Sequence, residues 1–413
     1  MEFATGVSCA FRASETIAHL AFEAACIKNS KSMRSVPLIA ALLVMFTGFT
    51  SQAAPRRAAA ARKAPIDISQ NIQNDFQNWD SNHDGQLDLR ELNAAIEKPT
   101  VAGVDAAIAV AFRRKLNADI KRDEEVGSLT AAEAAAAANE VPFQRQVKSI
   151  EAHIHKVSRV LFLPTDPNLY TFHQGPVGDC YLMSVIGAVV FRDAKTIRSM
   201  IEPQSNGGFI VHFASGRNIT LPPLTDGELV IGSPEGSSHG IWMGVLEQTW
   251  AQLTREVREK KTGKTIEDDE ALDTDLIGHG GYAGPVIGQF TGHKASSASV
   301  GRWTKQDPNS VTNRMEKLLT SLTADHRVIV ALTHAANKKL PVPNHHFFAV
   351  LSYDASRRVV RMFNPWGNKH QPAGPPGLEN GYVTEHGFFE VPIGEFLQIF
   401  GGVEYETQTP FKN

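Results

Sequence analysis

The sequence predicts an α+β protein in which a small all-helical domain precedes a larger mixed one. Apolar residues at helical spacing flank a twelve-residue acidic loop in the first quarter of the chain. A glycine-containing turn then leads into a long apolar helix that begins at Cys180. The second half holds runs of alternating residues separated by short turns, which is typical of β-strands. Helices followed by a block of strands favour the α+β class.

Composition bounds what this chain does. Its 413 residues are 42% hydrophobic and 21% charged, which excludes a disordered or collagen-like chain, and the length predicts two or three domains. With 41 Lys+Arg against 44 Asp+Glu, the net charge of −3 gives no electrostatic basis for nucleic-acid binding. The three cysteines, Cys9, Cys26 and Cys180, are too few for a disulfide-stapled scaffold or a Cys-rich zinc module.

Residues 33–54 have the pattern of a secretory signal peptide. Arg34 precedes an apolar run over 36–49, and small residues lead to a cleavage site near Ala54. The run is short for a membrane span. The alternative is a buried core helix, but the Ala/Arg/Lys/Pro-rich stretch 55–66 that follows is typical of a linker. We therefore expect a secreted or periplasmic protein, with no stable membrane anchor after cleavage.

Residues 1–32 precede the signal, so we interpret them as an upstream extension and Met33 as a plausible start. On this interpretation, Cys180 is the only thiol of the mature chain. A lone cysteine is either a small buried hydrophobic residue or a reactive nucleophile.

An EF-hand calcium loop is predicted between two short helices. Residues 68–79 place apolar side chains at helical spacing, and a second such stretch ends at Pro99. Between them, Asp80–Glu91 reads DSNHDGQLDLRE and fills each obligatory position of the loop, with hard oxygen ligands of the kind that Ca²⁺ prefers. The alternative is a solvated acidic turn. The predicted Ca²⁺ ligands are Asp80, Asn82, Asp84, Gln86 (through its carbonyl), Asp88 (through water) and Glu91.

EF-hands usually pair, and a degenerate partner is predicted downstream. In a loop that starts at Arg122, Gly127, Leu129 and Glu133 occupy positions 6, 8 and 12, whereas Arg122 and Val126 spoil positions 1 and 5. We expect this hand to support the first without binding calcium well. The sequence thus predicts an EF-hand domain over 67–140 and a connecting helix over 141–164.

Cys180 is the first candidate catalytic residue. The turn Gly175–Gly178 brings it to the start of an apolar helix that is predicted to run to about Val190. The positive end of the helix dipole is expected to lower the pKa of its thiol. The Gln174 side-chain amide and the Cys180 N–H would together form an oxyanion hole. The alternative is a structural cysteine that begins a core helix.

The strand region supplies a candidate base and orienting group. His346 is predicted on one strand and Asn364 on the next, where the amide would accept the imidazole Nδ1–H and fix its tautomer. A register slip of one residue would present His345 instead. Trp366 is expected to shield the His–Asn hydrogen bond from water, and the alternative is a plain core aromatic.

Together these motifs resemble the calpain family of papain-like cysteine proteases, over residues 169–405. The stretches that carry the resemblance are QGPVGDCYLM, HFFAV and RMFNPWG. It implies a two-lobed α+β catalytic core, predicted over 165–410, with the cleft between a Cys-bearing helical lobe and a His/Asn-bearing β lobe. The residue roles that it implies are nucleophile for Cys180, general acid/base for His346, orienting group for Asn364 and oxyanion donor for Gln174.

Three departures from the family pattern matter. Tyr181 replaces the usual Trp after the cysteine, and Pro222 and Pro223 stand where the family commonly has an Asp-Asp pair. In animal calpains the EF-hands follow the core, whereas here the predicted hand precedes it. Calcium activation of the core is therefore an analogy, and the EF-hand domain is a candidate intramolecular regulator.

The sequence hypothesis is a secreted, bacterial-type, calcium-dependent cysteine endopeptidase that acts on protein substrates through an acyl-enzyme. Two alternatives remain open. One is a catalytically inactive calcium-binding scaffold or adhesion protein with a protease-derived fold. The other keeps the thiol chemistry but performs acyl transfer, as transglutaminases do.

Overall fold

The computed structural model describes residues 68–121, 127–232, 239–266, 273–302, 307–333 and 341–411, without the side chains of 119–121, 273–274 and 302. The predicted extension, signal peptide and linker lie outside these ranges, as do Arg122 and Val126 of the predicted second loop. In the part of the chain that is described, none of the helices is long and apolar enough to cross a membrane.

An N-terminal group of amphipathic helices forms its own apolar core. α1 buries Ile68, Ile72, Phe76 and Trp79, the residues that its 3.6-residue periodicity places on one face. Two short antiparallel strands join the two loops, with Leu87 opposite Leu129. The elements are α1 Ile68–Trp79, β1 Gln86–Asp88, α2 Leu89–Glu97, α3 Val104–Lys121, β2 Ser128–Thr130, α4 Ala131–Asn139 and α5 Val141–Ile154.

The connecting helix is shorter than predicted. α5 ends at Ile154 rather than at residue 164. The chain beyond it uses its backbone elsewhere, because the Val160 carbonyl accepts a hydrogen bond from Ile241 N–H at 3.0 Å. The apolar residues beyond Ile154 led to the prediction of a longer helix. They pack without being helical, since Val157 joins the core around α6.

A second group of helices surrounds the segment that begins at Cys180. α6 extends ten residues beyond the predicted end at Val190, with an extended backbone at Asp193 (φ −160°, ψ 104°) that divides it into two helical parts. The elements of this group are α6 Cys180–Met200, β3 Ile201–Pro203, β4 Phe209–His212, β5 Asn218–Leu221, α7 Asp226–Ile231, α8 Trp242–Thr262, α9 Asp273–Ile277 and α10 Ala283–Thr291.

The remaining strands form a six-stranded antiparallel sheet in the order β10-β9-β8-β7-β11-β6. A separate three-stranded sheet has the order β3-β4-β5. The elements around the larger sheet are β6 His293–Ser299, the 3₁₀ turn η1 Val300–Arg302, α11 Pro308–Ala324, β7 Ile329–Thr333, β8 Phe347–Asp354, β9 Val359–Phe363, β10 Phe388–Pro392, α12 Ile393–Ile399 and β11 Phe400–Pro410. The expected mixture of helices and strands is confirmed.

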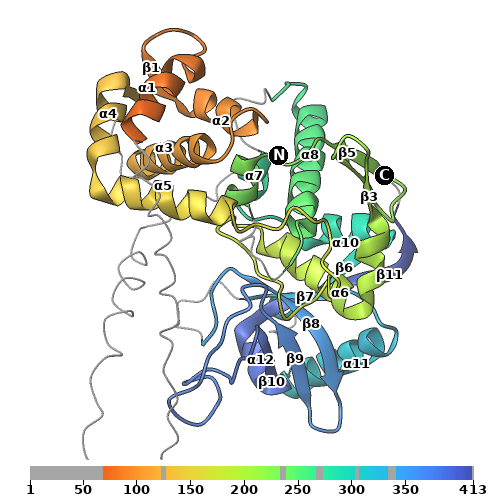
Figure 1. Cartoon of the computed structure of the whole chain (residues 1–413). Helices are drawn as coiled ribbons and strands as arrows, with labels where there is room; N and C mark the ends of the chain where they lie inside the picture. The colour runs from red at the N-terminus through yellow and green to blue at the C-terminus, as the bar shows by residue number, and fades with distance from the viewer. Residues whose placement is uncertain are drawn as a thin grey trace, which may run out of the picture. The chain divides into compact units, whose positions relative to one another are not determined.

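β8 is buried on both faces, and this double burial positions the site. Phe347 and Ala349 pack into the core that contains α6, whereas Phe348 and Val350 pack into the core under α11 and α12. Successive strand residues point to opposite faces, so the two cores fix β8 over its buried part, Phe347–Leu351. Figure 1 shows α6 beside β7 and β8.

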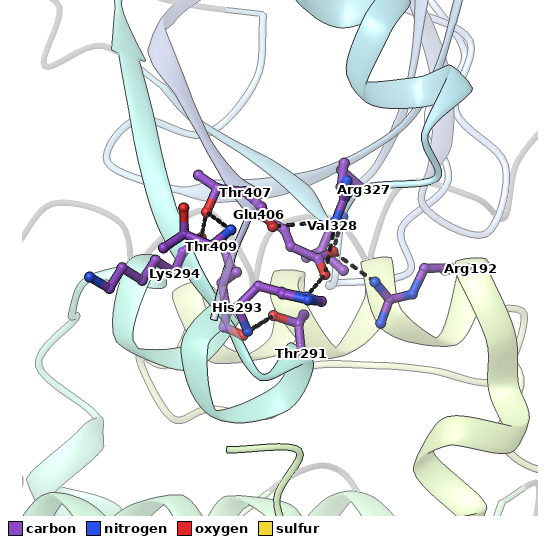
Figure 2. Close-up of polar contacts among 10 residues, drawn as sticks. Arg192, Thr291, His293, Lys294, Arg327, Val328, Glu406, Thr407 and Thr409 are labelled. Atoms are coloured by element: carbon purple, nitrogen blue, oxygen red, sulfur yellow. Dashed lines mark hydrogen bonds and ion pairs between the residues drawn. The ribbon is translucent and has the colours of Figure 1, made fainter. Parts of the chain in front are cut away.

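A buried carboxylate ties α6 to the sheet. Glu406 on β11 is only 2% exposed. Its carboxylate accepts hydrogen bonds from Arg192 of α6 at 2.7 Å and from the Val328 N–H at 3.0 Å. It also contacts His293 Nδ1 at 2.7 Å. Arg327 lies 3.8 Å away. Figure 2 shows these groups converging on one side chain. Helix and strands therefore depend on a single negative charge.

Glu406→Gln is expected to destabilise the fold by about 3 kcal/mol, because removing one member of a buried ionic cluster leaves the others without compensation. The free energy of unfolding from urea titration measures this. The control is Glu390→Gln, which breaks an exposed ion pair with Arg357 and should change stability little. Equal losses in the two variants would contradict the assignment of Glu406 as the tie.

Candidate active site

Cys180 is the first residue of α6, and the turn before it needs glycine. A Cβ at Gly178 would lie 2.2 Å from the Gly278 carbonyl oxygen, and the Gly178 carbonyl accepts a hydrogen bond from Gly280 N–H. The Asp179 carbonyl starts the helix by accepting from Leu182 N–H at 2.8 Å. The thiol is thereby held at a helix N-terminus, as the sequence predicted.

His346 and Asn364 are brought into contact by neighbouring strands. β8 begins one residue after His346, and β9 ends one residue before Asn364. His346 Nε2 lies 2.9 Å from Asn364 Oδ1. The nitrogen is thus Nε2, and the prediction of Nδ1 is wrong. Because Oδ1 only accepts, Nε2 carries the proton and Nδ1 is left as an acceptor.

Backbone contacts hold this pair in place. His346 N–H donates to Thr333 Oγ1 at 3.0 Å, and Thr333 N–H donates to the His346 carbonyl at 3.1 Å. Asn364 Oδ1 also accepts from Trp366 N–H at 3.1 Å, and Asn364 Nδ2 donates to Asn368 Oδ1 at 3.0 Å. His346 and Asn364 are 4% and 2% exposed, so their hydrogen bond is shielded from water.

Trp366 covers the imidazole. The centroids of its ring and the His346 ring are 4.4 Å apart. The Trp366 side chain is nevertheless 45% exposed, which excludes a plain core aromatic. It lies between the imidazole and solvent, where the sequence analysis expected it.

The starts of α6 and β8 meet at the thiol. The backbone N–H of Phe347 interacts with the Cys180 sulfur. Since Phe347 directly follows His346, this contact places the nucleophile candidate beside the base candidate. His345 is exposed and has a left-handed backbone (φ 50°). The buried, hydrogen-bonded residue is therefore His346, and the register slip that would favour His345 does not occur.

Burial sets the charge state of both groups. It raises the pKa of the Cys180 thiol, although the N–H groups of Phe347 and Tyr181 act in the opposite direction. The predicted lowering by the helix N-terminus is therefore wrong in sum, because desolvation outweighs it. Burial also lowers the pKa of His346 to about 4, although the hydrogen bond that the ring donates to Asn364 acts in the opposite direction. The resting pair is a neutral thiol and a neutral imidazole, which suits proton transfer from one to the other.

Gln174 is anchored beside the site but its amide lies differently from the expectation. Its backbone N–H donates to the Pro365 carbonyl at 2.7 Å, which fixes it next to Asn364. Its Nε2 donates one hydrogen bond to the Val177 carbonyl at 2.8 Å. The sequence analysis had instead expected the amide to form an oxyanion hole with the Cys180 N–H. The Val177 carbonyl, in the turn before Cys180, is the acceptor that the Gln174 amide reaches. Nε2 carries two hydrogens, so one remains for another acceptor.

Two residues of the site escaped the sequence analysis. Asp179 directly precedes Cys180, and Glu247 lies on α8; both side chains are 0% exposed. The signal was present, because Glu247 interrupts the apolar run IWMGVLEQTW. Acidic side chains on the buried side of a helix are rare without a partner.

The acidic loop, Asp80–Glu91, is organised by its own carboxylates. Asp80 accepts from Asp84 N–H at 3.1 Å and from Gly85 N–H at 3.0 Å, and Gly85 has the positive φ of +79° that such a turn requires. Glu91 accepts from Ser81 N–H at 2.8 Å and forms a capping box with Asp88. Among the described residues, no three or more His, Cys, Asp or Glu side chains already converge as a metal site.

The second loop pairs with the first through its strand. Thr130 caps α4 and forms a capping box with Glu133. Leu129 lies opposite Leu87, so positions 8 of the two predicted loops face each other. Gly127 directly precedes β2, and Glu133 lies in the first turn of α4.

Comparison with known families identifies the class of protein. The model of the calpain family cysteine protease matches residues 125–375, which is more than half of the chain and includes Cys180, His346 and Asn364. The chain therefore belongs to the calpain family of cysteine proteases. No curated protein matches it.

The lowered pKa of His346 predicts that the stability of the fold depends on pH. His346 has a pKa near 6.5 when unfolded and about 4 when folded, so folding favours the neutral ring. Its stabilising contribution is complete above pH 6.5 and is lost as the pH falls towards 4, by about 3 kcal/mol. Urea denaturation at several pH values should show a smaller acid loss in His346→Gln. The exposed control His345→Gln should keep the wild-type loss, and identical profiles for all three proteins would contradict the burial argument.

Proposed function

We propose that the chain is a calcium-dependent cysteine endopeptidase whose nucleophile is Cys180. The observation that carries this proposal is the contact between the starts of α6 and β8. It unites a thiol, a neutral imidazole and an orienting amide from segments more than 160 residues apart. The proposed substrate-binding region lies where the starts of α6 and β8 meet, and protein chains are the proposed substrates.

The proposed reaction follows the charge states of these groups. His346 Nδ1 takes the thiol proton as sulfur attacks the peptide carbonyl. The Cys180 N–H and the second Gln174 amide hydrogen then receive the oxyanion. The imidazolium then gives its proton to the leaving amine. Water, deprotonated by His346, hydrolyses the thioester and regenerates the thiol. Asn364 holds the ring by Nε2 throughout.

Calcium binding at the acidic loop is proposed together with the protease activity. The donor set Asp80, Asn82, Asp84, Gln86, Asp88 and Glu91 consists of the hard oxygens that Ca²⁺ takes, and the turn at Gly85 supports the loop geometry. The ion would compete for the carboxylates of Asp80 and Glu91 that now accept loop N–H groups. The antiparallel pairing of β1 and β2 is what a pair of EF-hands, one of them degenerate, would share.

The helical domain is docked where it could influence the core. Thr225, the N-cap of α7, donates its hydroxyl to the Ile96 carbonyl at the end of α2 at 2.7 Å. A Cβ at Gly227 would come within 2.8 Å of Ile96 Cγ2, so α7 and α2 pack closely. Gly103 N–H donates to Asp226 at 2.7 Å. Since Glu91 lies in the first turn of α2, we propose that the loop regulates the protease intramolecularly through α7.

Export through the segment at 33–54 is proposed as well, which would make this a secreted or periplasmic enzyme of bacterial type. The support for this proposal is the sequence pattern, in which Arg34 precedes the apolar run over 36–49 and small residues lead to Ala54.

Casein cleavage by the full chain and by the form beginning at Ala54 tests the protease assignment. With calcium, both Cys180→Ala and His346→Ala should lose at least about 1000-fold in kcat/KM, because members of a catalytic triad act as a unit. Mass spectrometry of the products should show new N-termini. Release of ammonia or amine exchange without new N-termini would favour acyl transfer. No reaction with or without calcium, from protein shown to be folded, would favour the scaffold alternative.

Asp80→Ala combined with Glu91→Ala should abolish calcium binding to the first domain, measured by calorimetry, because both carboxylates at the ends of the loop are then lost. The matched control is Glu379→Ala, an exposed acid outside the loop. If the loop is the sensor, the double variant also loses the calcium dependence of casein cleavage. Unchanged dependence would contradict regulation by the loop and place the switch in the core.

A further inference from the structure

The imidazole of His173 lies against the loop that carries Asn364 and Trp366. His173 directly precedes Gln174 and is half-buried. A Cβ at Gly367 would overlap the Nδ1 edge of the His173 ring, so the ring packs directly on the backbone of that loop. The ring also makes a hydrogen bond to the backbone carbonyl of Trp366. The reaction proposed above does not use this histidine.

The loop is a tight turn that needs glycine at its end. The Gly367 N–H donates to the Asn364 carbonyl at 3.0 Å, which closes the turn, and Gly367 has a positive φ of +61°. The Asn364 N–H donates to the Gly387 carbonyl at 2.8 Å, which holds the start of the turn. The His173 ring contacts the last two residues of the turn, so the position of Trp366 depends on this ring.

The segment of His173 joins two functional groups of the site. The Gln174 N–H donates to the Pro365 carbonyl at 2.7 Å, and the His173 ring binds the next carbonyl along, that of Trp366. Two successive residues of one segment therefore bind two successive carbonyls of the other. This pairing fixes the proposed oxyanion donor Gln174 relative to the indole that covers His346.

His173 acts as a neutral donor. Burial is the largest cause that lowers the pKa of its imidazole, and the nearby His239 and His386 lower it further, whereas the hydrogen bond to the Trp366 carbonyl acts in the opposite direction. A neutral imidazole has one N–H to donate. At pH 7 the ring therefore holds the carbonyl without adding a positive charge near His346.

We propose that His173 is a positioning residue that anchors the Trp366 indole over His346. This inference rests on the proposed protease function. The centroids of the indole and imidazole rings are 4.4 Å apart, and the imidazole donates to Asn364 at 2.9 Å beneath this cover. Burial is the largest cause of the lowered pKa of His346, so the anchored indole helps to keep the base neutral and oriented.

The pKa of His346 reports on this anchor without any need for protease activity. In the full chain carrying Cys180→Ala, the NMR signal of His346, assigned through His346→Gln, should titrate near pH 4. Adding His173→Phe keeps an aromatic ring but removes the donor, so the indole is released and water reaches the imidazole. The pKa of His346 should then rise from about 4 towards the 6.5 of an exposed histidine.

Two further variants separate the donor from general effects of substitution. His155→Phe, at an exposed histidine that caps the end of α5, should leave the pKa of His346 unchanged. His173→Asn supplies an amide N–H in place of the ring N–H, so it should keep the pKa of His346 low. An unchanged pKa of His346 in folded His173→Phe, or an equal rise in His173→Asn, would overturn the proposal. A merely structural role would lower the free energy of unfolding and leave this pKa unchanged.

In the active chain, the anchor should affect turnover rather than binding. His173→Phe is expected to lower kcat for a peptide substrate by about 10- to 100-fold with KM nearly constant, because a displaced base transfers protons less well. His173→Asn should retain most of the wild-type kcat. A raised KM with unchanged kcat in His173→Phe would contradict the positioning role. Since the NMR proteins have no nucleophile, a failure there is distinct from a failure of the protease assignment.

Discussion

The contact between the Phe347 N–H and the Cys180 sulfur joins the two halves of the site, and most of the fold serves to maintain it. One partner begins a helix and the other begins a strand, so neither can move without its whole element. β8 is fixed by apolar cores on both faces. α6 is fixed by its packing on that strand and by the Glu406 carboxylate, which reaches Arg192 from the sheet. Close backbone approach at Gly178 sets where the helix starts.

The same burial that fixes the geometry decides the electrostatics. Taken from water, the thiol and the imidazole both favour their neutral forms. In the mechanism that we propose, the nucleophile is therefore produced by proton transfer during attack and not by a standing ion pair.

Local pattern was enough to predict the helix over 68–79, the loop that follows it, the helix that begins at Cys180, and the contact of His346 with Asn364. Each of these depends on periodicity, glycine position or strand adjacency. What failed depended on tertiary burial. The helix dipole favoured a low thiol pKa, but desolvation reversed it. Segment 155–164 has helical spacing, yet the Val160 carbonyl pairs with Ile241. The Gln174 amide donates to the Val177 carbonyl of the adjacent turn. The complete burial of Glu247 depends on where α8 packs, which local sequence does not show.

Covalent labelling of the full chain with a thiol-directed peptidyl epoxide tests the central claim most directly. Peptide mapping by mass spectrometry locates the adduct, and His346→Ala serves as the comparison. If the meeting of α6 and β8 creates an activated nucleophile, the wild-type chain carries one adduct at Cys180 and His346→Ala reacts at least about 100-fold more slowly, since the buried thiol then lacks its base. Equal labelling rates in the two proteins, or no adduct at Cys180 in folded wild type, would contradict the account.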